Sequence, residues 1–334
     1  MSHKPLTSSE IASLWTSYLQ NTMSKCVLEY FLSFVQDPDI IPCIEQIHGL
    51  SASNVNEIKN KLVSENIPVP VGFSEHDVNV SAKKMFSDTF CLMYINQMAK
   101  VGIIGYGVFQ AMVARMDLSQ FFSLALKNIS DLHNQANELM LEKGLLIRPP
   151  MVPTQDSVEF IKSNKYFSGF NPFSEERPLN VIEISHLYEN IQNNLLGMML
   201  CIGFSQSARS QTVRDYLFRG SEISNKHIQI FGKLLIESGI QVPMSWDAQT
   251  MKSREAPFSD KLMMFHIDLL VASSIGNYAA ASAASMRNDI SLTYGRLSAE
   301  VAKYAKDGAK IMVENRWLEE PPQSANREEI KSRK

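Results

Sequence analysis

Apolar residues recur along this chain at the spacing of amphipathic helices. When successive residues are turned by about 100°, the large apolar side chains between residues 184 and 202 fall on one side of a helix. They are Ile184, Leu187, Tyr188, Ile191, Leu195, Met198 and Ile202. Such a stripe faces the interior of a helical bundle. In the first half of the chain, the same type of pattern predicts four helices, over residues 7–35, 38–65, 81–115 and 118–143.

The helical pattern occurs twice. A shift of 173 positions superposes identical residues along the first helices, and after a one-residue deletion the match continues to the end of the unit. We therefore predict two copies of one four-helix bundle, over residues 6–150 and 179–322. An aromatic-rich linker over residues 151–178 joins them, and a tail over residues 323–334 is expected to be disordered. The identities include Leu6 with Leu179, Asn21 with Asn194, Phe86 with Phe258, Tyr106 with Tyr278 and Pro150 with Pro322.

The connection between the second and third helices is long. In the first copy it covers residues 67–80 and begins with the sequence IPVPVG. The Pro-Val-Pro segment favours extended chain, at about 3.1 Å per residue. It can therefore span about 40 Å, the length of a helix of some 27 residues. This predicts the long-crossover, ferritin-like form of the four-helix bundle. The linker carries five aromatic residues, so we expect it to pack across both units; they are Phe160, Tyr166, Phe167, Phe170 and Phe173.

Composition narrows the function classes. Charged residues make up 20% of the chain and its net charge is −3, so we expect no nucleic-acid partner, because nucleic-acid-binding proteins use dense basic surfaces. No apolar run reaches the roughly 20 residues of a membrane-spanning helix. The polar first ten residues do not resemble a secretory signal, which favours a cytoplasmic protein. The four cysteines lack the spacing of a zinc site or a disulfide set.

Two histidines of the second copy fall on core-facing stripes. These are His227 and His266, and the first copy has Asn54 and Tyr94 at the matching positions. A buried imidazole needs a hydrogen-bond partner, because an unsatisfied one costs about 1–3 kcal/mol. Each is therefore either a satisfied core histidine or a ligand of a metal or small molecule.

The long crossover places these histidines at different depths, so we do not expect one shared site. Glu300 lies near the expected level of His227. If the second copy holds a divalent metal, the candidate ligands are His227, His266 and Glu300. The sequence does not identify any cofactor.

Other acidic residues and histidines are weaker candidates. The pairs Glu45 with His48 and Glu183 with His186 have the Glu-x-x-His spacing of di-iron bundles. They lie on helices that do not match between the copies, so we expect both pairs to be partly solvated surface. Glu29 lies on the core stripe of its helix and is expected to reach solvent or to pair with a neighbour.

An Arg-x-Asp motif occurs at the end of the third helix in each copy, as Arg115 with Asp117 and Arg287 with Asp289. We interpret it as a structural helix turn. The arginine would face the negative end of the third helix, and the aspartate would be the N-cap of the fourth. In the first copy Gln120 would complete a capping box.

Small residues gather in the third helix of both copies. The first copy has Gly102, Gly105 and Gly107, and the second has a run of serine, glycine and alanine over residues 273–284. Small side chains allow helices to approach closely. These faces therefore suit self-association or contact with other proteins.

Several motifs taken together resemble a known family. They are GFSEHDVN, FSDTF, ARMDLSQFF, RPLNVIEISHLYEN, PFSDKLMMFH and RWLEEPP. The resemblance is to domain-of-unknown-function 3231, a family of spore-forming Gram-positive bacteria whose members commonly hold two copies. It implies a ferritin-like bundle and a link to sporulation, and some relatives carry a spore-coat label. It assigns no catalytic residue.

The sequence shows no Ser/His/Asp grouping, phosphate-binding glycine loop or acid/base pair. We therefore predict a non-enzymatic structural or interaction protein linked to sporulation or the spore coat, located in the mother cell or the spore. Its expected partners are other spore proteins or further copies of itself. The alternative is a ferritin-like bundle that binds a metal or small ligand in the second copy, and a divergent oxidase is a third option.

Overall fold

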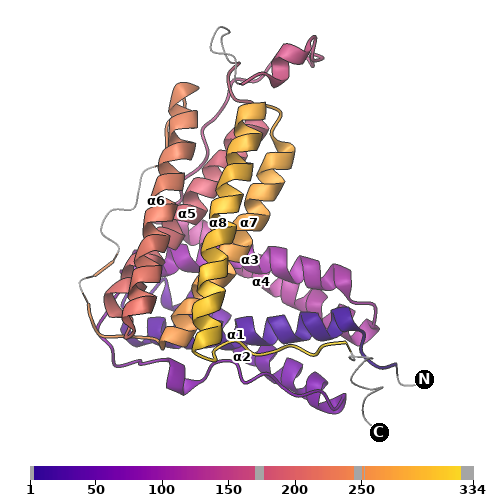
Figure 1. Cartoon of the computed structure of the whole chain (residues 1–334), viewed down its shortest axis with the longest axis vertical. Coiled ribbons are helices and arrows are strands. Elements are labelled where there is room, and N and C mark those ends of the chain that lie inside the picture. Colours follow the sequence, from indigo (N-terminus) through magenta and orange to yellow (C-terminus); the bar gives the residue numbers. More distant parts are fainter. Residues whose placement is uncertain (1–3, 170–176, 244–249, 252, 325–334) are drawn as a thin grey trace.

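The computed structural model describes residues 4–169, 177–243, 250–251 and 253–324. Eight long α-helices make up most of this part of the chain (Figure 1), together with two short 3-10 turns. The all-helical fold of two tandem four-helix bundles is confirmed, and the described residues contain isolated β-bridges but no strand. The first bundle contains α1 (Ser8–Phe34), α2 (Ile41–Ser64), η1 (Glu75–Asp77), α3 (Asp88–Met112) and α4 (Met116–Glu142). The linker holds η2 (Asn164–Phe167), and the second bundle contains α5 (Val181–Ser207), α6 (Gln211–Glu237), α7 (Asp260–Ala284) and α8 (Asn288–Glu314).

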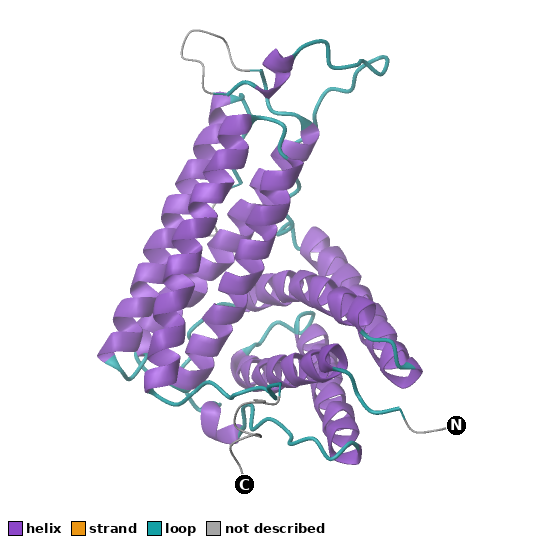
Figure 2. Cartoon of the chain, turned by 45° about the vertical axis from the view of Figure 1, so that its right-hand side comes forward, coloured by secondary structure: helices purple, strands orange, loops and turns teal. Residues whose placement is uncertain are grey.

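The two bundles cross near one end. Figure 2 shows the second bundle standing upright and the first projecting from its base, which gives the molecule an L shape. Within each bundle the closest pairs are sequence neighbours: α1 with α2, α3 with α4, α5 with α6 and α7 with α8. None of the helices in the described part of the chain is long and apolar enough to cross a lipid bilayer.

The long crossover between the second and third helices is confirmed. At one end of the first bundle the Asp88 carboxylate, which opens α3, accepts the Gln36 N–H just beyond α1 at 3.0 Å. At the other end the Glu10 carboxylate in α1 accepts the Arg115 N–H just beyond α3 at 2.8 Å. Helix α3 is therefore antiparallel to α1 and parallel to α2. The chain must travel the length of the bundle between α2 and α3.

Helix α3 begins seven residues later than the sequence pattern predicts. The Ser87 hydroxyl accepts the Phe90 N–H at 3.0 Å and caps the helix at that point. The residues before it are extended because they pair with the crossover segment of the second copy. The Asn79 N–H donates to the Pro257 carbonyl, and the Met251 N–H donates to the Met85 carbonyl, both at 2.7 Å.

These contacts are reciprocal. Asn79 corresponds to Met251 in the repeat and Met85 to Pro257, so each copy donates one hydrogen bond to the other and the two bonds are equivalent. Isolated β-bridges pair Val78 with Phe258 and Phe86 with Thr250 in the same manner. An exchange of equivalent residues is the mark of a two-fold interface. The chain is therefore a covalent pseudo-dimer.

Aromatic rings fill the centre of this junction. The Phe86 ring lies 6.3 Å from Phe204, and the Tyr30 ring lies 5.3 Å from Phe258. Gly203 makes this packing feasible, since a Cβ atom there would lie 2.8 Å from the Phe86 ring. The largest apolar cluster is consequently continuous through both bundles.

The free end of the first bundle has a separate core. Its buried members come from α1, α2 and α4, and none of them belongs to the large cluster. The apolar interior of the first bundle is thus interrupted along its length. The members of this end cluster are Leu14, Tyr18, Ile58, Leu62, Leu118, Phe121 and Phe122.

A buried carboxylate ties the third-to-fourth helix turn to the first helix in both copies. Glu183 is fully buried and accepts the N–H groups of Met286 at 3.1 Å and Arg287 at 3.0 Å. Arg177 donates to both of its oxygens at 2.7 and 2.8 Å. Glu10 accepts the corresponding N–H groups in the first copy. We call this arrangement the glutamate clasp.

The Arg-x-Asp motif has a different geometry from the predicted one. Arg115 and Arg287, not the aspartates, are the N-cap residues of α4 and α8, and neither makes a side-chain capping bond. Asp117 and Asp289 lie in the first helical turn and bind the guanidinium of the preceding arginine with two hydrogen bonds each. The predicted aspartate caps are therefore wrong, because the paired guanidinium takes up the carboxylate oxygens.

The linker packs less than expected. Phe160 is 87% exposed, so the prediction that it packs across both units is wrong. Tyr166 stacks against Arg177, with the guanidinium carbon 4.0 Å from the ring centre. Phe170 and Phe173 lie outside the described residues, as does most of the predicted disordered tail.

The clasp makes a prediction for stability. Burial raises the pKa of Glu183, but hydrogen bonds from Arg177 and from the backbone outweigh it and hold the pKa below 4.5. The stabilisation is therefore complete above about pH 5 and is lost as the pH falls through the folded-state pKa. We expect Glu183→Gln to lower the free energy of unfolding by about 2 kcal/mol at pH 7. Urea denaturation should show this difference shrinking below about pH 4.

Glu237→Gln is the matched control, because Glu237 is half-exposed and, among the described residues, pairs only with Lys233 of the same helix. It should change the stability by less than about 0.5 kcal/mol. Equal stability of Glu183→Gln and the wild-type chain at pH 7 would contradict the clasp.

Candidate functional site

A polar cluster lies inside the first bundle, midway along α1. Asn21 donates its amide to the Tyr106 hydroxyl at 3.0 Å, and that hydroxyl donates back to the Asn21 oxygen at 3.2 Å. Asn54 of α2 donates to the Tyr106 hydroxyl at 3.0 Å and to the Asn21 oxygen at 3.2 Å. Three helices thus contribute to one network where the apolar core is interrupted.

A cavity of about 240 Å³ adjoins this cluster. Residues of all four helices of the first bundle line it, and Leu269, Ala272 and Ser273 of α7 form part of its rim. None of the described side chains that line it is an aspartate, glutamate, lysine or arginine. Its apolar wall includes Met23, Ile47, Met98, Ile104, Phe109 and Ile129.

The second copy has a histidine at the equivalent level. His227 is fully buried, with Nδ1 2.9 Å from the Tyr278 hydroxyl and Nε2 3.2 Å from a Glu300 oxygen. Asn194 donates to the same hydroxyl at 2.7 Å, as Asn21 does in the first copy. The expected proximity of Glu300 to His227 is found. Lys226 also binds Glu300, at 2.8 Å.

Burial decides the charge of His227. It lowers the imidazole pKa below 6.5, and Glu300, which raises it, only partly compensates. The neutral ring can donate from Nε2 to the Glu300 carboxylate while Nδ1 accepts the Tyr278 hydroxyl proton. Both ring nitrogens are then satisfied, which is the arrangement of a core histidine.

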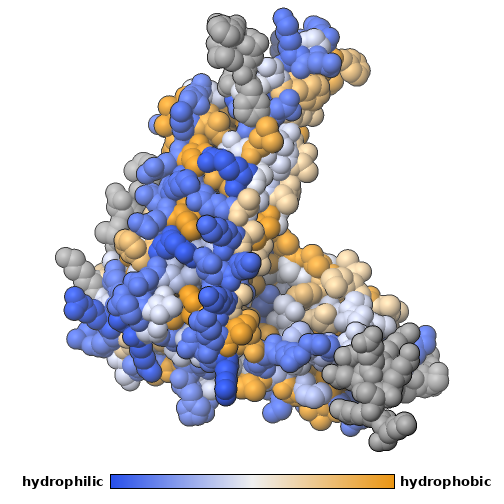
Figure 3. All heavy atoms as spheres, in the orientation of Figure 1, coloured by the Kyte–Doolittle hydropathy of each residue, from blue (hydrophilic) through white to orange (hydrophobic). Residues whose placement is uncertain are grey.

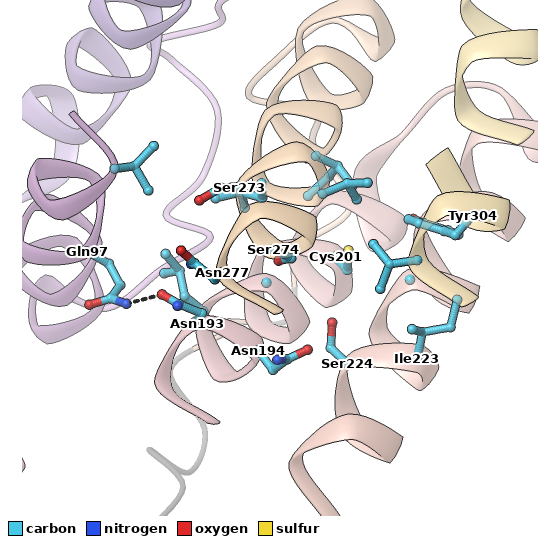
Figure 4. A pocket seen from close by; sticks show the side chains of 18 residues that line it. Gln97, Asn193, Asn194, Cys201, Ile223, Ser224, Ser273, Ser274, Asn277 and Tyr304 are labelled. Atoms are coloured by element: carbon cyan, nitrogen blue, oxygen red, sulfur yellow. Dashed lines mark hydrogen bonds between the residues drawn. The ribbon is translucent and has the colours of Figure 1, made fainter. Parts of the chain in front are cut away.

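The cavity of the second copy occupies the same place but holds only about 60 Å³ (Figure 4). Asn193, Asn194 and Ser224 line it at positions equivalent to Gln20, Asn21 and Ser51 of the first cavity. Gln97 of the first copy reaches its edge and donates to Asn193. The two cavities are thus related by the pseudo-two-fold axis.

A tyrosine pair joins α6 to α8 inside the second bundle. The rings of Tyr216 and Tyr304 are parallel, with centres 4.2 Å apart, and each hydroxyl donates to the other residue's carbonyl. Tyr304 also lines the small cavity. The matching residues of the first copy, Cys43 and Leu132, are smaller. The tyrosine hydroxyls lie against Gly220 and Gly308, where the first copy has Ile47 and Ala136. The difference in cavity volume, about 240 against 60 Å³, favours the first copy as the place for a ligand.

The candidate metal ligands are not brought together. His266 binds the Tyr94 hydroxyl across the pseudo-two-fold axis at 3.2 Å, and burial lowers its pKa to about 3. On α7 it lies twelve residues from Tyr278, the partner of His227, which is about 18 Å. Among the described residues there is no group of three or more histidines, cysteines or acids that could hold a metal ion. Only His227 and Glu300 remain close, fewer than the three or four protein ligands of a zinc site.

The other acidic candidates form ordinary pairs. Glu29 lies 3.3 Å from His48 and 3.4 Å from Lys25, so it pairs with neighbours as expected. Glu183 belongs to the glutamate clasp, and the prediction that it is partly solvated is wrong. The sequence pattern could not show the clasp, because its backbone donors, Met286 and Arg287, lie about a hundred residues further along the chain.

Sequence reasoning also missed the first cavity. The identities of Asn21 with Asn194 and of Tyr106 with Tyr278 were visible as two polar residues on core-facing stripes. They indicate that buried polar residues lie at the same depth along the axis of each bundle. The volume beside that level depends on side chains from five helices, which no local pattern reveals.

Comparison with known proteins gives a family but no activity. The family model described as "Protein of unknown function (DUF3231)" matches residues 1–158 and 167–330. None of the curated proteins compared with the sequence matches it. A crystal structure of a candidate spore coat protein from Bacillus halodurans is similar, with 16% identity and a TM-score of 0.43. The alignment covers 45% of this chain and 98% of that one. This likeness is too weak to bear on function.

The neutral state of His227 makes a prediction about pH. An unfolded histidine takes up a proton near pH 6.5, whereas buried His227 resists it, so the wild-type chain loses stability as the pH falls below that value. We expect His227→Asn, which installs the residue of the first copy, to weaken this dependence between about pH 7 and pH 5. At pH 7 the loss of ring volume should cost about 1–3 kcal/mol. Urea denaturation at several pH values measures both effects, and an unchanged slope would contradict a neutral His227.

Proposed function

Since this chain belongs to the DUF3231 family of unknown function, we propose that it is a non-enzymatic structural protein linked to sporulation that self-associates. The observation that carries the proposal is an apolar stripe on the first bundle. On α3, Ile104, Val108 and Met112 follow one another at intervals of four residues and are 45–56% exposed. Met116 and Leu124 of α4 are also exposed. An exposed group of large apolar side chains marks an interaction site.

The equivalent surface of the second bundle is different. The positions of Ile104, Val108 and Met112 are taken by Gly276, Ala280 and Ala284. Figure 3 shows apolar surface over the projecting α3 and α4. One chain therefore carries large apolar side chains on one copy and small ones at the same place on the other.

This difference favours a second chain as the occupant of the stripe. Large side chains of one molecule can pack against the small-residue face of the next, where little side chain keeps the helices apart. A contact between unlike faces is heterologous, and it leaves one free face of each kind at the ends. Repetition of that contact builds an open assembly, which suits a structural role. Location in the mother cell or spore belongs to the same proposal.

The proposal predicts an association that depends on concentration. Sedimentation velocity of the full chain should show species larger than the monomer, in increasing amounts at higher concentration. Val108→Lys should abolish them by placing a charge in the contact, and Ala280→Lys should do so from the opposite face. A desolvated unpaired charge costs several kcal/mol.

Val63→Lys is the matched control, because Val63 is 57% exposed on α2 of the same bundle, outside the stripe. It should associate like the wild-type chain. A wild-type chain that stays monomeric at every concentration would refute self-association. An effect of Val108→Lys without an effect of Ala280→Lys would refute the head-to-tail contact.

The link to sporulation is tested by timing. In the organism that encodes the chain, we expect the protein to accumulate after the onset of sporulation and to fractionate with the spore or mother cell. Immunoblotting of cells through growth and sporulation measures this. Equal amounts in growing and sporulating cells would contradict the link.

A further inference from the structure

We propose that the cavity of the first copy is a binding site for a small neutral molecule with an apolar body and one hydroxyl group. The packing of the bundle points to this place. The cavity lies between the large shared core and the separate end cluster, whereas the buried apolar residues of the second copy form one cluster around a much smaller cavity. The cavity opens to solvent, since the lining residue Ile104 is 56% exposed. An apolar ligand that enters it removes apolar side chains from water, which is favourable.

The lining decides the charge of the ligand. Methionine, isoleucine and phenylalanine side chains form most of the wall, and the polar groups among the described lining residues are amides and hydroxyls. A charged ligand would lose its hydration without gaining an ion pair, which is strongly unfavourable. The site therefore selects a neutral molecule.

The polar cluster fixes one end of the ligand. The Tyr106 hydroxyl and the Asn21 oxygen are fully engaged within the cluster, and Asn54 uses its amide N–H groups there. The Asn54 oxygen accepts no hydrogen bond from the part of the chain that the structure describes, although Asn54 lines the cavity. A ligand hydroxyl can donate to this oxygen.

The volume sets the size. An apolar protein cavity of about 150 Å³ holds benzene, so a cavity of about 240 Å³ suits a body somewhat larger than one ring. A ring with a short alkyl chain, about ten non-hydrogen atoms in total, meets this limit.

The second copy shows why its own cavity is closed to such a molecule. His227 replaces Asn54 and occupies the acceptor's position, while Leu297 replaces Ala125 in the fourth helix. Only about 60 Å³ remain. The internal repeat thus provides a built-in comparison in which the same scaffold lacks the site.

Isothermal titration calorimetry measures the binding of para-propylphenol to the full chain. We expect one molecule to bind per chain. Gly105→Leu should weaken binding at least about tenfold, because Gly105 lines the cavity and its added side chain meets no atom within 4 Å of the Cβ position. The substitution also removes a helix glycine, so it does not threaten the fold.

Gly107→Leu is the control, since Gly107 lies on the same helix, has equally open space at Cβ and does not line the cavity. It should bind within about twofold of the wild-type chain. Para-propyltoluene, which lacks the hydroxyl, should bind about fivefold more weakly or worse. The anion para-propylbenzoate should not bind measurably.

Three results would overturn the proposal: no binding of para-propylphenol by the wild-type chain, equal binding by Gly105→Leu, or binding of para-propylbenzoate at least as tight as that of the phenol. Circular dichroism melts of both glycine variants confirm that they are folded. The stripe and the cavity share Ile104, so the two proposals are separated by other residues: Val108→Lys changes the stripe and leaves the cavity lining intact, whereas Gly105→Leu changes the cavity lining and leaves the three stripe residues of α3 intact. Sedimentation of Gly105→Leu and calorimetry of Val108→Lys therefore test self-association and ligand binding one at a time.

Discussion

The aromatic junction between the two bundles is the contact on which the rest of the structure depends. Phe86 and Phe204 meet across the pseudo-two-fold axis, and the crossover segments on either side exchange backbone hydrogen bonds. Burial of rings of this size supplies much of the stability of a small core. Because the apolar cluster runs through both bundles, neither bundle has a complete core at the end where they join. The long crossovers are therefore structural parts of the interface as well as connections between helices.

The two copies use one scaffold for different interiors. The backbone donors of the glutamate clasp and the asparagine–tyrosine pair occur at equivalent positions in both copies. The side-chain donor of the clasp differs, since Arg177 binds Glu183 and Thr7 binds Glu10. Around this common frame the first copy keeps a cavity of about 240 Å³, whereas the second keeps only about 60 Å³ and has His227 at the position of Asn54. These shared contacts hold the helices at equivalent positions in the two copies, whereas the residues that line the cavities between them differ.

Sequence patterns predicted the parts of the fold that depend on local periodicity and on repetition. Eight helices, two copies and the long crossover follow from apolar spacing, repeated identities and a proline-rich segment. The start of α3 was missed because extended residues before Ser87 pair with the other copy, a contact that local pattern does not encode. The predicted aspartate caps of the Arg-x-Asp motif were wrong because the Asp117 carboxylate accepts two hydrogen bonds from the Arg115 guanidinium and does not cap the helix. The candidate site was found only in part: His227 and Glu300 do meet, but the larger cavity beside Asn54 results from the sum of many side-chain volumes.

Joining the two halves in one chain has a genetic consequence. In a dimer of identical subunits every substitution appears twice, once on each side of the two-fold axis, so a change that suits one side must be tolerated on the other. Here Tyr94 faces His266 across that axis. The two residues occupy equivalent positions, so a dimer of identical subunits could not form this pair of unlike residues. Tandem duplication removed that restriction. The two halves can therefore differ at their centres, with His227 in one and open space beside Asn54 in the other.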